Sequence, residues 1–197
     1  MKIILCITLF ILFIIWARLL LKEKLVKVDQ KVYNKIKFSN KKTNFLRIFT
    51  NLASTPYFII ICILLVLFLR NKKLALLISL AMIIDAGIVY IAKHIIKRER
   101  PNIKRLVEEK GYSFPSGHTF SATCFYGLCI FLTYYSSINF IYQMLIIISL
   151  ISLIITIGFS RIYLGVHYFS DVIGGLLLSS SYVCLYVYLV YDILNLL

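Results

Sequence analysis

Three short polar patterns in the chain combine residue types that suit phosphate chemistry, and two of the three histidines lie inside them. The patterns, in chain order, are Lys93-x6-Arg100-Pro101, Pro115-Ser116-Gly117-His118 and Ser160-Arg161-x5-His167-x3-Asp171. Hydrolysis of a phosphate ester needs an in-line nucleophile, a proton for the leaving oxygen and groups that neutralise a dianion. The residue types in the three patterns can serve all of these needs.

Several of these residues can bind a phosphate. Arg100 and Arg161 can each donate two parallel hydrogen bonds to phosphate oxygens, and Lys93 adds a positive charge. The amides of Ser116 and Gly117 open an expected helix, whose N-terminus favours an anion. Gly117 has no side chain, so the backbone can approach a ligand closely there.

The two histidines suit different roles. His167 and Asp171 are four residues apart, so on a helix they would lie on one face. A carboxylate bonded to one ring nitrogen fixes the tautomer and leaves the other nitrogen free to attack. His118, at the start of another expected helix, could hold the proton for the leaving oxygen. A lone His at a helix end is more often a simple interfacial residue, but complementary groups in three segments favour a site.

The composition places these patterns in a membrane protein. The chain has 197 residues, of which 61% are hydrophobic, and soluble domains are about 45–50% apolar. We expect an all-α polytopic fold in which residues 1–197 form one domain, with a catalytic core at about 55–190. The five cysteines lie in apolar runs without a CxxC pair, so we interpret them as small hydrophobic residues.

Six apolar runs approach the length of about 20 residues that a membrane span needs. The first run has no small-residue cleavage site and is interpreted as a retained signal anchor. The six expected transmembrane helices are 3–21, 55–70, 74–96, 118–136, 140–159 and 169–190. Because successive spans alternate in direction, the three polar patterns are expected at one membrane face.

The connection 22–53 joins the first two expected spans. Leu25, Val28, Val32 and Ile36 recur at three- and four-residue steps, which is typical of an interfacial amphipathic helix. Nine Lys or Arg residues accompany only two acids in this stretch. Two roles stay open: simple anchoring at the membrane surface, or a lid that gathers an anionic lipid. The net charge of +14 fits anionic headgroups or a phosphorylated substrate, and no nucleic-acid motif accompanies it.

The ordered triple of patterns resembles the signature of the type 2 phosphatidic acid phosphatase superfamily, and every signature position is present. Residues 106–119 are further similar to bacterial membrane members related to phosphatidylglycerophosphatase B and undecaprenyl-diphosphate phosphatases. The resemblance covers residues 55–190 well. It implies a six-helix membrane fold and two-step hydrolysis that needs no metal or other cofactor. With eight Asp and Glu in all, the chain shows no metal-ligand spacing either.

The resemblance also implies a role for each signature residue. His167 would attack phosphorus and form a phosphohistidine, Asp171 would orient it, and His118 would protonate the leaving oxygen and then help to activate water. The residues that would bind phosphate are Lys93, Arg100, Ser116, Gly117, His118 and Arg161. The leading substrates are undecaprenyl diphosphate and phosphatidylglycerol phosphate. The alternatives are a broad phosphatidic acid phosphatase, a non-catalytic lipid-binding or flipping protein, and a vanadium-dependent haloperoxidase, against which the lipid setting argues.

The resemblance and the charge pattern disagree about which side of the membrane carries the site. Six Lys or Arg residues lie in 97–110 and nine in 22–53, so the positive-inside rule would place this face in the cytoplasm. We nevertheless expect the extracytoplasmic face, as the resemblance implies. The first connection is long and partly interfacial, and basic groups at the catalytic face have a separate use in attracting phosphate.

Asp85 lies inside the third expected span, eight residues before Lys93. Two helical turns would place it roughly on the Lys93 face, about 12 Å deeper. Intramembrane carboxylates are costly and often functional, but we favour a structural hydrogen bond over a role in tuning the site. Gly174 and Gly175 are expected to allow close helix packing.

Overall fold

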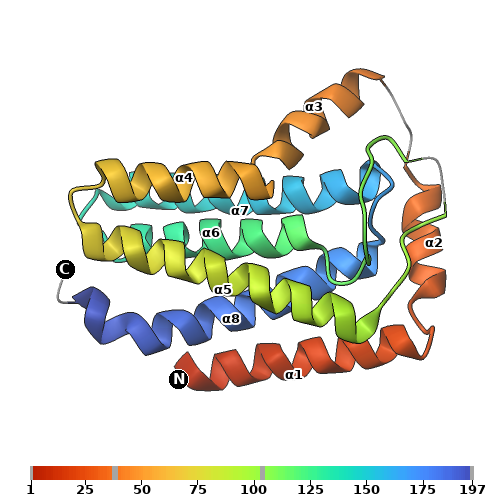
Figure 1. Cartoon of the computed structure of the whole chain (residues 1–197), viewed down its shortest axis with the longest axis horizontal. Helices are drawn as coiled ribbons and strands as arrows, with labels where there is room; N and C mark the ends of the chain where they lie inside the picture. Colours follow the sequence, from red (N-terminus) through yellow and green to blue (C-terminus); the bar gives the residue numbers. More distant parts are fainter. Residues whose placement is uncertain (1, 37–39, 103–104, 196–197) are drawn as a thin grey trace.

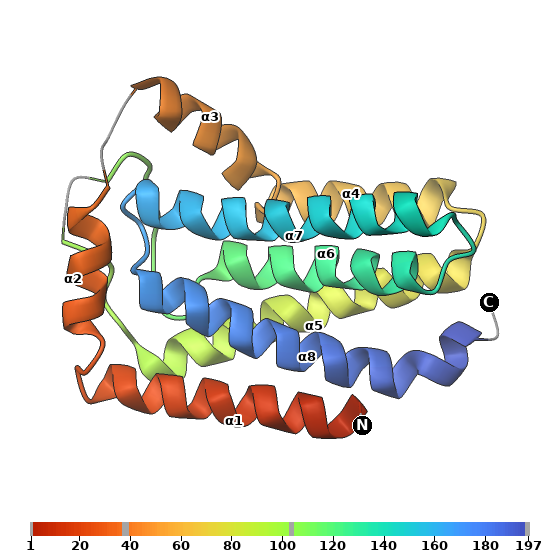
Figure 2. The same ribbon diagram turned by 180° about the vertical axis from the view of Figure 1, so that it is seen from behind.

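The computed structural model describes residues 2–36, 40–102 and 105–195, and every regular element in these ranges is an α-helix. The helices are α1 (Lys2–Leu21), α2 (Val26–Asn34), α3 (Asn40–Asn51), α4 (Thr55–Phe68), α5 (Lys72–Ile96), α6 (Gly117–Tyr134), α7 (Phe140–Tyr163) and α8 (Phe169–Asn195). Of these, the six helices with 14 or more residues form a bundle (Figures 1 and 2). The helix α2 crosses one end of the bundle, and α3 projects beside it. Both termini point away from that end (Figure 1).

The helix α6 lies inside the bundle, where it packs against α5, α7 and α8. The helix α1 packs along α8, and α3 contacts α7. Tyrosine hydroxyls connect the helices by donating to main-chain oxygens across them. The Tyr182 hydroxyl donates to the oxygen of Ala81 at 2.8 Å, and the Tyr186 hydroxyl to that of Leu77 at 2.6 Å. Bonds of this kind satisfy polar groups that lipid could not.

The six expected spans coincide in position with α1 and α4 to α8, but not all of these helices satisfy the criteria for a membrane span. In the described part of the chain, four helices are long and apolar enough, or five if α3 and α4, bent by 44°, form one span. The four are Ile3–Leu21, Lys72–Ile96, Phe140–Tyr163 and Phe169–Val190. At 14 residues, α4 is only about 21 Å long. The count of six is therefore not confirmed, while a multi-pass membrane protein is supported.

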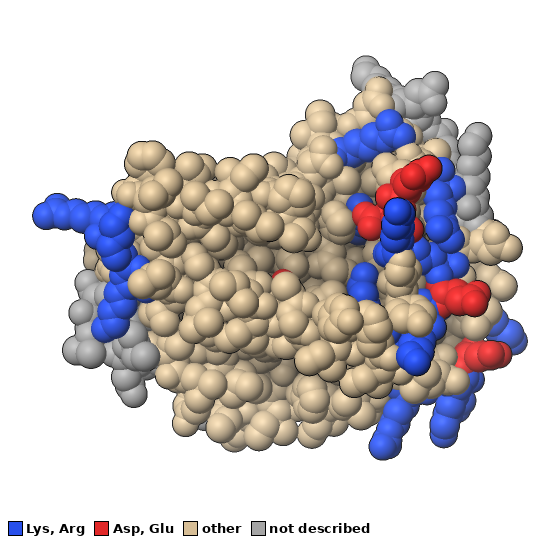
Figure 3. Space-filling model, viewed as in Figure 1, with Lys and Arg blue, Asp and Glu red and all other residues tan. Residues whose placement is uncertain are grey.

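The surface of the bundle has the character of a membrane protein. Large apolar side chains are widely exposed, and Phe68, Ile95 and Phe140 expose 78%, 75% and 69% of their area. Figure 3 shows an apolar band between two ends where Lys and Arg gather. The end that carries α2 and α3 also holds acidic residues. An apolar band of this extent would be unstable in water and is suited to lipid.

The first connection forms two helices, where the sequence suggests one amphipathic helix. Glu23 adopts a left-handed backbone conformation (φ 57°) where the chain turns from α1 into α2. Leu25 is buried with the core, whereas the amphipathic pattern places it in lipid. Asp29 is also buried, because this side of α2 faces the start of α8. Val28 remains exposed. An interfacial role of α2 is thus not confirmed.

Asp85 bonds within the bundle, as the structural interpretation predicts. Its side chain is buried in α5, and its Oδ2 atom accepts a 2.6 Å hydrogen bond from the Ser121 hydroxyl of α6. This bond joins two neighbouring helices inside the apolar part of the fold.

Candidate active site

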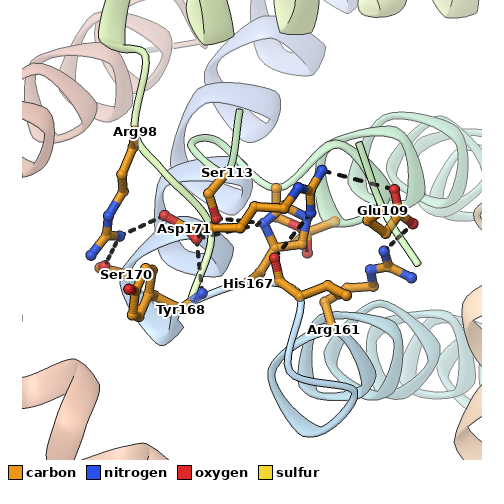
Figure 4. A network of polar contacts seen from close by, with 12 residues as sticks. Arg98, Glu109, Ser113, Arg161, His167, Tyr168, Ser170 and Asp171 are labelled. Atoms are coloured by element: carbon orange, nitrogen blue, oxygen red, sulfur yellow. Dashed lines mark hydrogen bonds and ion pairs between the residues drawn. The ribbon is translucent and has the colours of Figure 1, made fainter. Parts of the chain in front are cut away.

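The helix ends that carry the three polar patterns lie at the end of the bundle that α2 crosses (Figure 1), and Figure 4 shows Arg161, His167 and Asp171 of the third pattern. Lys93 comes from the last turn of α5, and Ser116 to His118 come from the start of α6. Arg161 lies in the last turn of α7, and Asp171 in the first turn of α8. The Lys93 ammonium lies close to Gly117, since a Cβ built there would be 3.9 Å from its Nζ atom. Electrostatic interactions connect His118 with Arg161, His167, Lys93 and Arg100.

His167 lies in the short connection between α7 and α8, so the helical position expected from its spacing to Asp171 is wrong. Gly165 adopts a left-handed conformation (φ 74°) after α7, and α8 begins only at Phe169. The imidazole still reaches Asp171, whose Oδ2 lies 3.5 Å from Nδ1. Burial, opposed by Asp171, lowers the pKa of His167 to about 4. The ring is therefore neutral at pH 7.

Ser113 stands between the two partners. Its hydroxyl lies 3.3 Å from His167 Nδ1 and donates a 2.5 Å hydrogen bond to Asp171 Oδ2. The carboxylate can only accept hydrogen bonds, and the serine hydroxyl uses its proton on the carboxylate. Both neighbours of Nδ1 are therefore acceptors, which places the ring proton on Nδ1 and leaves a lone pair on Nε2. A neutral ring with a free Nε2 is the form that can act as a nucleophile.

Asp171 is fully buried and held by several donors. Its Oδ2 atom accepts from the main-chain amide of Tyr168 at 2.8 Å, as the third residue of a helix does in a capping box. Its Oδ1 atom accepts from Arg98 at 2.6 Å. Together with Ser113, these contacts fix the carboxylate that faces His167 (Figure 4).

Arg100 donates toward Nε2 of His167, the ring nitrogen that carries the lone pair. Its Nε and Nη2 atoms donate to the main-chain oxygens of Gly111 and Lys110, both at 2.9 Å. Its Nη1 atom donates to the oxygen of Val166 at 3.0 Å and lies 3.4 Å from Nε2 of His167. Main-chain carbonyls thus fix the guanidinium beside the position where a reacting phosphorus atom would lie.

Glu109 bridges the two arginines that the sequence analysis assigns to phosphate binding. Its carboxylate bonds the Nη2 atom of Arg161 and lies 3.8 Å from Nη2 of Arg100. The Arg161 side chain is 1% exposed, and its Nη1 atom donates to the Thr50 hydroxyl at 2.6 Å. Among the described side chains, its Nε atom has no hydrogen-bond partner. The site therefore already holds one carboxylate between two cations (Figure 4).

The start of α6 differs from the expectation in one respect. The Ser116 amide was expected to face an anion, but it donates to the main-chain oxygen of Asp171 at 3.0 Å. The amides of Gly117 and His118 follow it as the first N–H groups of the helix, where no intrahelical carbonyl is available to them. The expected close packing at Gly175 is confirmed, because a Cβ there would lie 2.9 Å from the oxygen of Ser116.

A cavity of about 500 Å³ opens beside His167. It lies between α2 and the two connections that carry His167 and Arg98, on the Asp29 side of the site, and its lining does not include Lys93, Arg100, His118 or Arg161. Its wall includes Asp29, Gln30, Tyr33, Arg98, Asn102 and His167. In the described part of the chain, no group of three His, Cys, Asp or Glu side chains is arranged to hold a metal ion.

Four residues of the site were missed in the sequence analysis. Ser113, Glu109 and Arg98 lie in the connection between α5 and α6, and Asp29 lies in α2. The one available signal was an acidic residue in a strongly basic segment, which describes both Asp29 and Glu109.

Comparisons with known proteins agree on one family. The sequence profile of the PAP2 superfamily matches residues 74–194. A phosphatidylglycerophosphatase B from Bacillus subtilis (strain 168) is 35% identical over 109 residues, a region that spans 55% of this chain and about half (54%) of that protein. An undecaprenyl-diphosphatase from Sulfolobus acidocaldarius is 27% identical over 180 residues, which cover 87% of this chain and 83% of that protein.

Two solved structures share the fold. The crystal structure of a transmembrane PAP2 type phosphatidylglycerolphosphate phosphatase from Bacillus subtilis superposes with a TM-score of 0.86 at 24% identity, covering 95% of this chain and 96% of that one. The crystal structure of Aquifex aeolicus LpxE gives a TM-score of 0.64 at 24% identity, with 83% and 94% covered. At this identity, both comparisons support the arrangement of the helices alone.

Proposed function

The chain belongs to the PAP2 superfamily, and from this premise we propose that it is an integral membrane phosphatase that hydrolyses a lipid phosphate or diphosphate through a phosphohistidine. The observation that carries the proposal is the state of His167. Its ring is buried and neutral, Nδ1 faces two acceptors, and Nε2 lies beside Arg100. An imidazole held in this way is prepared for attack on phosphorus.

In the first step, Nε2 of His167 attacks phosphorus in line with the ester oxygen. The N–P bond forms as the P–O bond breaks, and the leaving oxygen takes a proton from His118, whose imidazolium form is stabilised by the negative charge of the bound phosphate. Asp171 stabilises the positive charge that builds on the imidazole. Lys93, Arg100 and Arg161, with the amide of Gly117, neutralise the phosphoryl oxygens. Ser116 supports this cradle as the residue that precedes α6.

In the second step, water attacks the phosphohistidine. His118 accepts a proton from the water as the new P–O bond forms, the N–P bond breaks, and inorganic phosphate leaves with His167 restored. Neither step requires a metal ion, because side chains and a helix N-terminus balance the negative charge of the phosphoryl oxygens.

We propose undecaprenyl diphosphate or phosphatidylglycerol phosphate as the substrate. The names of the two curated relatives correspond to these two lipids. Broad activity that includes phosphatidic acid is the alternative, and a panel of lipid substrates distinguishes the two. We place the reaction at the extracytoplasmic face of the cell membrane.

The proposal is tested on the purified full-length protein in detergent with a panel of these three lipids. Wild-type protein should release inorganic phosphate, whereas His167→Ala should release none while inserting and folding normally. Quench of the wild-type reaction with labelled lipid in alkaline denaturant should trap phosphate on His167, because the N–P bond is labile in acid. Excess EDTA should leave the rate unchanged, and vanadate should inhibit it. Lipid binding without phosphate release would instead support a lipid-binding or flipping protein.

A further inference from the structure

Arg98 belongs to none of the three polar patterns, yet it contacts the centre of the site. Its Nη1 atom donates to Asp171 Oδ1 at 2.6 Å, and its Nη2 atom donates to Asp29 Oδ2 at 2.8 Å. The two carboxylate side chains are 0% and 1% exposed. A single guanidinium thus bridges a carboxylate of α8 and a carboxylate of α2, and the first of these orients His167.

The bridge is part of a closed network. Asp29 also accepts from the Ser170 amide at 2.9 Å and from the Ser170 hydroxyl at 2.7 Å. Arg98 Nη1 donates to the same hydroxyl at 2.6 Å, and the guanidinium lies 4.0 Å from the centre of the Tyr168 ring. Burial lowers the pKa of Arg98, but Asp171 and Asp29 outweigh it and raise the pKa overall. Arg98 therefore stays charged.

We propose that Arg98 and Asp29 are positioning residues for the hydrolysis: Asp29 anchors Arg98, and Arg98 holds the Asp171 carboxylate in the orientation that His167 requires. This inference rests on the proposed function, in which His167 is the nucleophile. It gives α2 a role in the reaction beyond contact with the membrane, because α2 supplies the anchor.

The distribution of bonds on Asp171 supports this assignment. Its Oδ2 atom accepts hydrogen bonds from the amide of Tyr168 and the hydroxyl of Ser113, and it faces Nδ1 of His167, which carries the ring proton. Its Oδ1 atom accepts from Arg98 at 2.6 Å. Without that contact the carboxylate could rotate about its last bond and lengthen its distance to Nδ1. A guanidinium buried between two carboxylates restricts this rotation in a way that a flexible ammonium cannot.

A charge at this place also has an electrostatic consequence. His167 and Asp171 exchange protons as a coupled pair, and a nearby cation disfavours protonation of that pair. Loss of Arg98 should therefore raise the pH at which the pair takes up a proton, whereas loss of Asp29 removes an anion and should not raise it. The other charged or titratable groups around the pair stay the same in both variants: Lys93, Arg100, Glu109, His118, Arg161 and Tyr168.

The experiment compares wild type with the full-length variants Arg98→Gln, Asp29→Asn and Arg98→Lys. It also includes the double variant that combines Asp29→Asn with Arg98→Gln. Arg98→Gln should lower kcat at least tenfold with KM within twofold, and should move the acid limb of kcat/KM upward by about one pH unit. Asp29→Asn should lower kcat without moving the limb upward. The double variant should match Arg98→Gln, because the anchor has no effect once the residue that it holds is gone. In Arg98→Lys the acid limb of kcat/KM should lie at its wild-type pH, whereas kcat should be between those of Arg98→Gln and wild type.

Two variants serve as matched controls for charge. Arg70→Gln removes an arginine from the turn between α4 and α5, at the other end of the bundle, and Lys31→Gln changes an exposed position of α2. Both should keep wild-type kinetics. Thermal unfolding in detergent shows whether each variant is folded, and kinetics are compared among folded variants.

The possible failures are distinguishable. If wild type releases phosphate and Arg98→Gln keeps wild-type kcat and the same acid limb, the inference is wrong and the proposed function stands. Equal and additive losses from the two single changes, with the limb unmoved, would also overturn the inference, since they indicate a purely structural contact. If wild-type protein releases no phosphate from any lipid of the panel, the proposed function fails and the inference fails with it.

Discussion

The main-chain amide of Ser116 donates a 3.0 Å hydrogen bond to the main-chain oxygen of Asp171. This bond joins the start of α6 to the first turn of α8, and so fixes the helix that carries His118 relative to the residue that orients His167. One turn further along α8, Gly174 and Gly175 pack closely against Phe114 and Ser116, which precede α6. A Cβ at Gly174 would lie 2.3 Å from the Phe114 ring. The distance between His118, the proposed acid, and His167, the proposed nucleophile, therefore depends on helix packing.

Substitution of Gly175 should consequently impair the reaction more than the fold. In Gly175→Ala the new methyl group would lie 2.9 Å from the Ser116 oxygen, a main-chain atom that can move only if α6 moves. We expect kcat to fall at least tenfold and the protein to lose about 1–3 kcal/mol of stability. Phosphate release and thermal unfolding measure the two effects.

Gly87→Ala is the matched control for this change. It adds the same methyl group to α5 at a position where no atom lies within 4 Å of the built Cβ. This variant should keep wild-type kcat and the same unfolding temperature, or a slightly higher one. Equal behaviour of the two variants would contradict a role for the α6–α8 contact in catalysis.

The protonation state of His167 gives a second prediction. Burial lowers its pKa to about 4, so the ring should remain neutral, with the proton on Nδ1, as the pH falls from 7 to about 5. Activity that needs the Nε2 lone pair should be lost only as the pH falls further, through about 4. NMR spectroscopy of the imidazole nitrogens reports both the tautomer and the midpoint, and His167→Ala identifies the signal. A midpoint near 6.5, the usual value for histidine, would show that the ring is not buried as described.

Glu109 provides a third prediction, because its carboxylate interacts with the two arginines that a phosphate would contact. The Glu109→Gln variant removes the negative charge from between Arg161 and Arg100. A phosphoryl group would then compete with a neutral amide, so we expect vanadate to inhibit at a concentration several-fold lower than for wild type. Inhibition curves with the preferred lipid measure this.

The neighbouring Glu108→Gln is the control for this third prediction, since Glu108 is exposed and carries the same charge one residue earlier. Vanadate should inhibit this variant at the same concentration as wild type. Weaker inhibition of Glu109→Gln by vanadate would reverse the interpretation and identify Glu109 as a support that holds Arg161 in place.

The contrast between His118 and Arg98 shows which parts of the site can be predicted from the sequence. Ser116, Gly117 and His118 are contiguous, and a Ser-Gly pair before an apolar run predicts a helix start, so their joint placement follows from local rules. Arg98 is one of six basic residues in 97–110 that look alike in the sequence. Its two partners lie 69 and 73 residues away, and only the packing of α2 against α8 brings all three together.

The fold, like the site, can be predicted from the sequence only in part. The long apolar helices were expected at nearly their observed positions, because burial in lipid imposes length and composition. Of the two short helices, α2 coincides with the expected amphipathic helix but turns Leu25 and Asp29 inward, and α3 was not expected. The apolar steps of 22–53 fit a lipid-facing helix, and nothing local shows that Asp29 turns inward to an arginine from another connection. The place of His167 ahead of α8 had one local signal, Gly165, whose left-handed backbone follows the end of α7.

The side of the membrane that carries the site gives the last prediction. Basic residues gather most densely at the end with α2 and the connection 97–116 (Figure 3), which by the positive-inside rule belongs in the cytoplasm. Several of these residues have partners in the site instead: Arg98 bonds Asp29 and Asp171, and Arg100 bonds main-chain oxygens. Because these charges form contacts within the fold, they are weaker evidence for the orientation of the protein in the membrane. We therefore expect this end to face outward and both termini, which point away from it, to lie in the cytoplasm. A reporter fused after Leu197 should then show cytoplasmic activity, and periplasmic-type activity would reverse the orientation while leaving the geometry of the site unchanged.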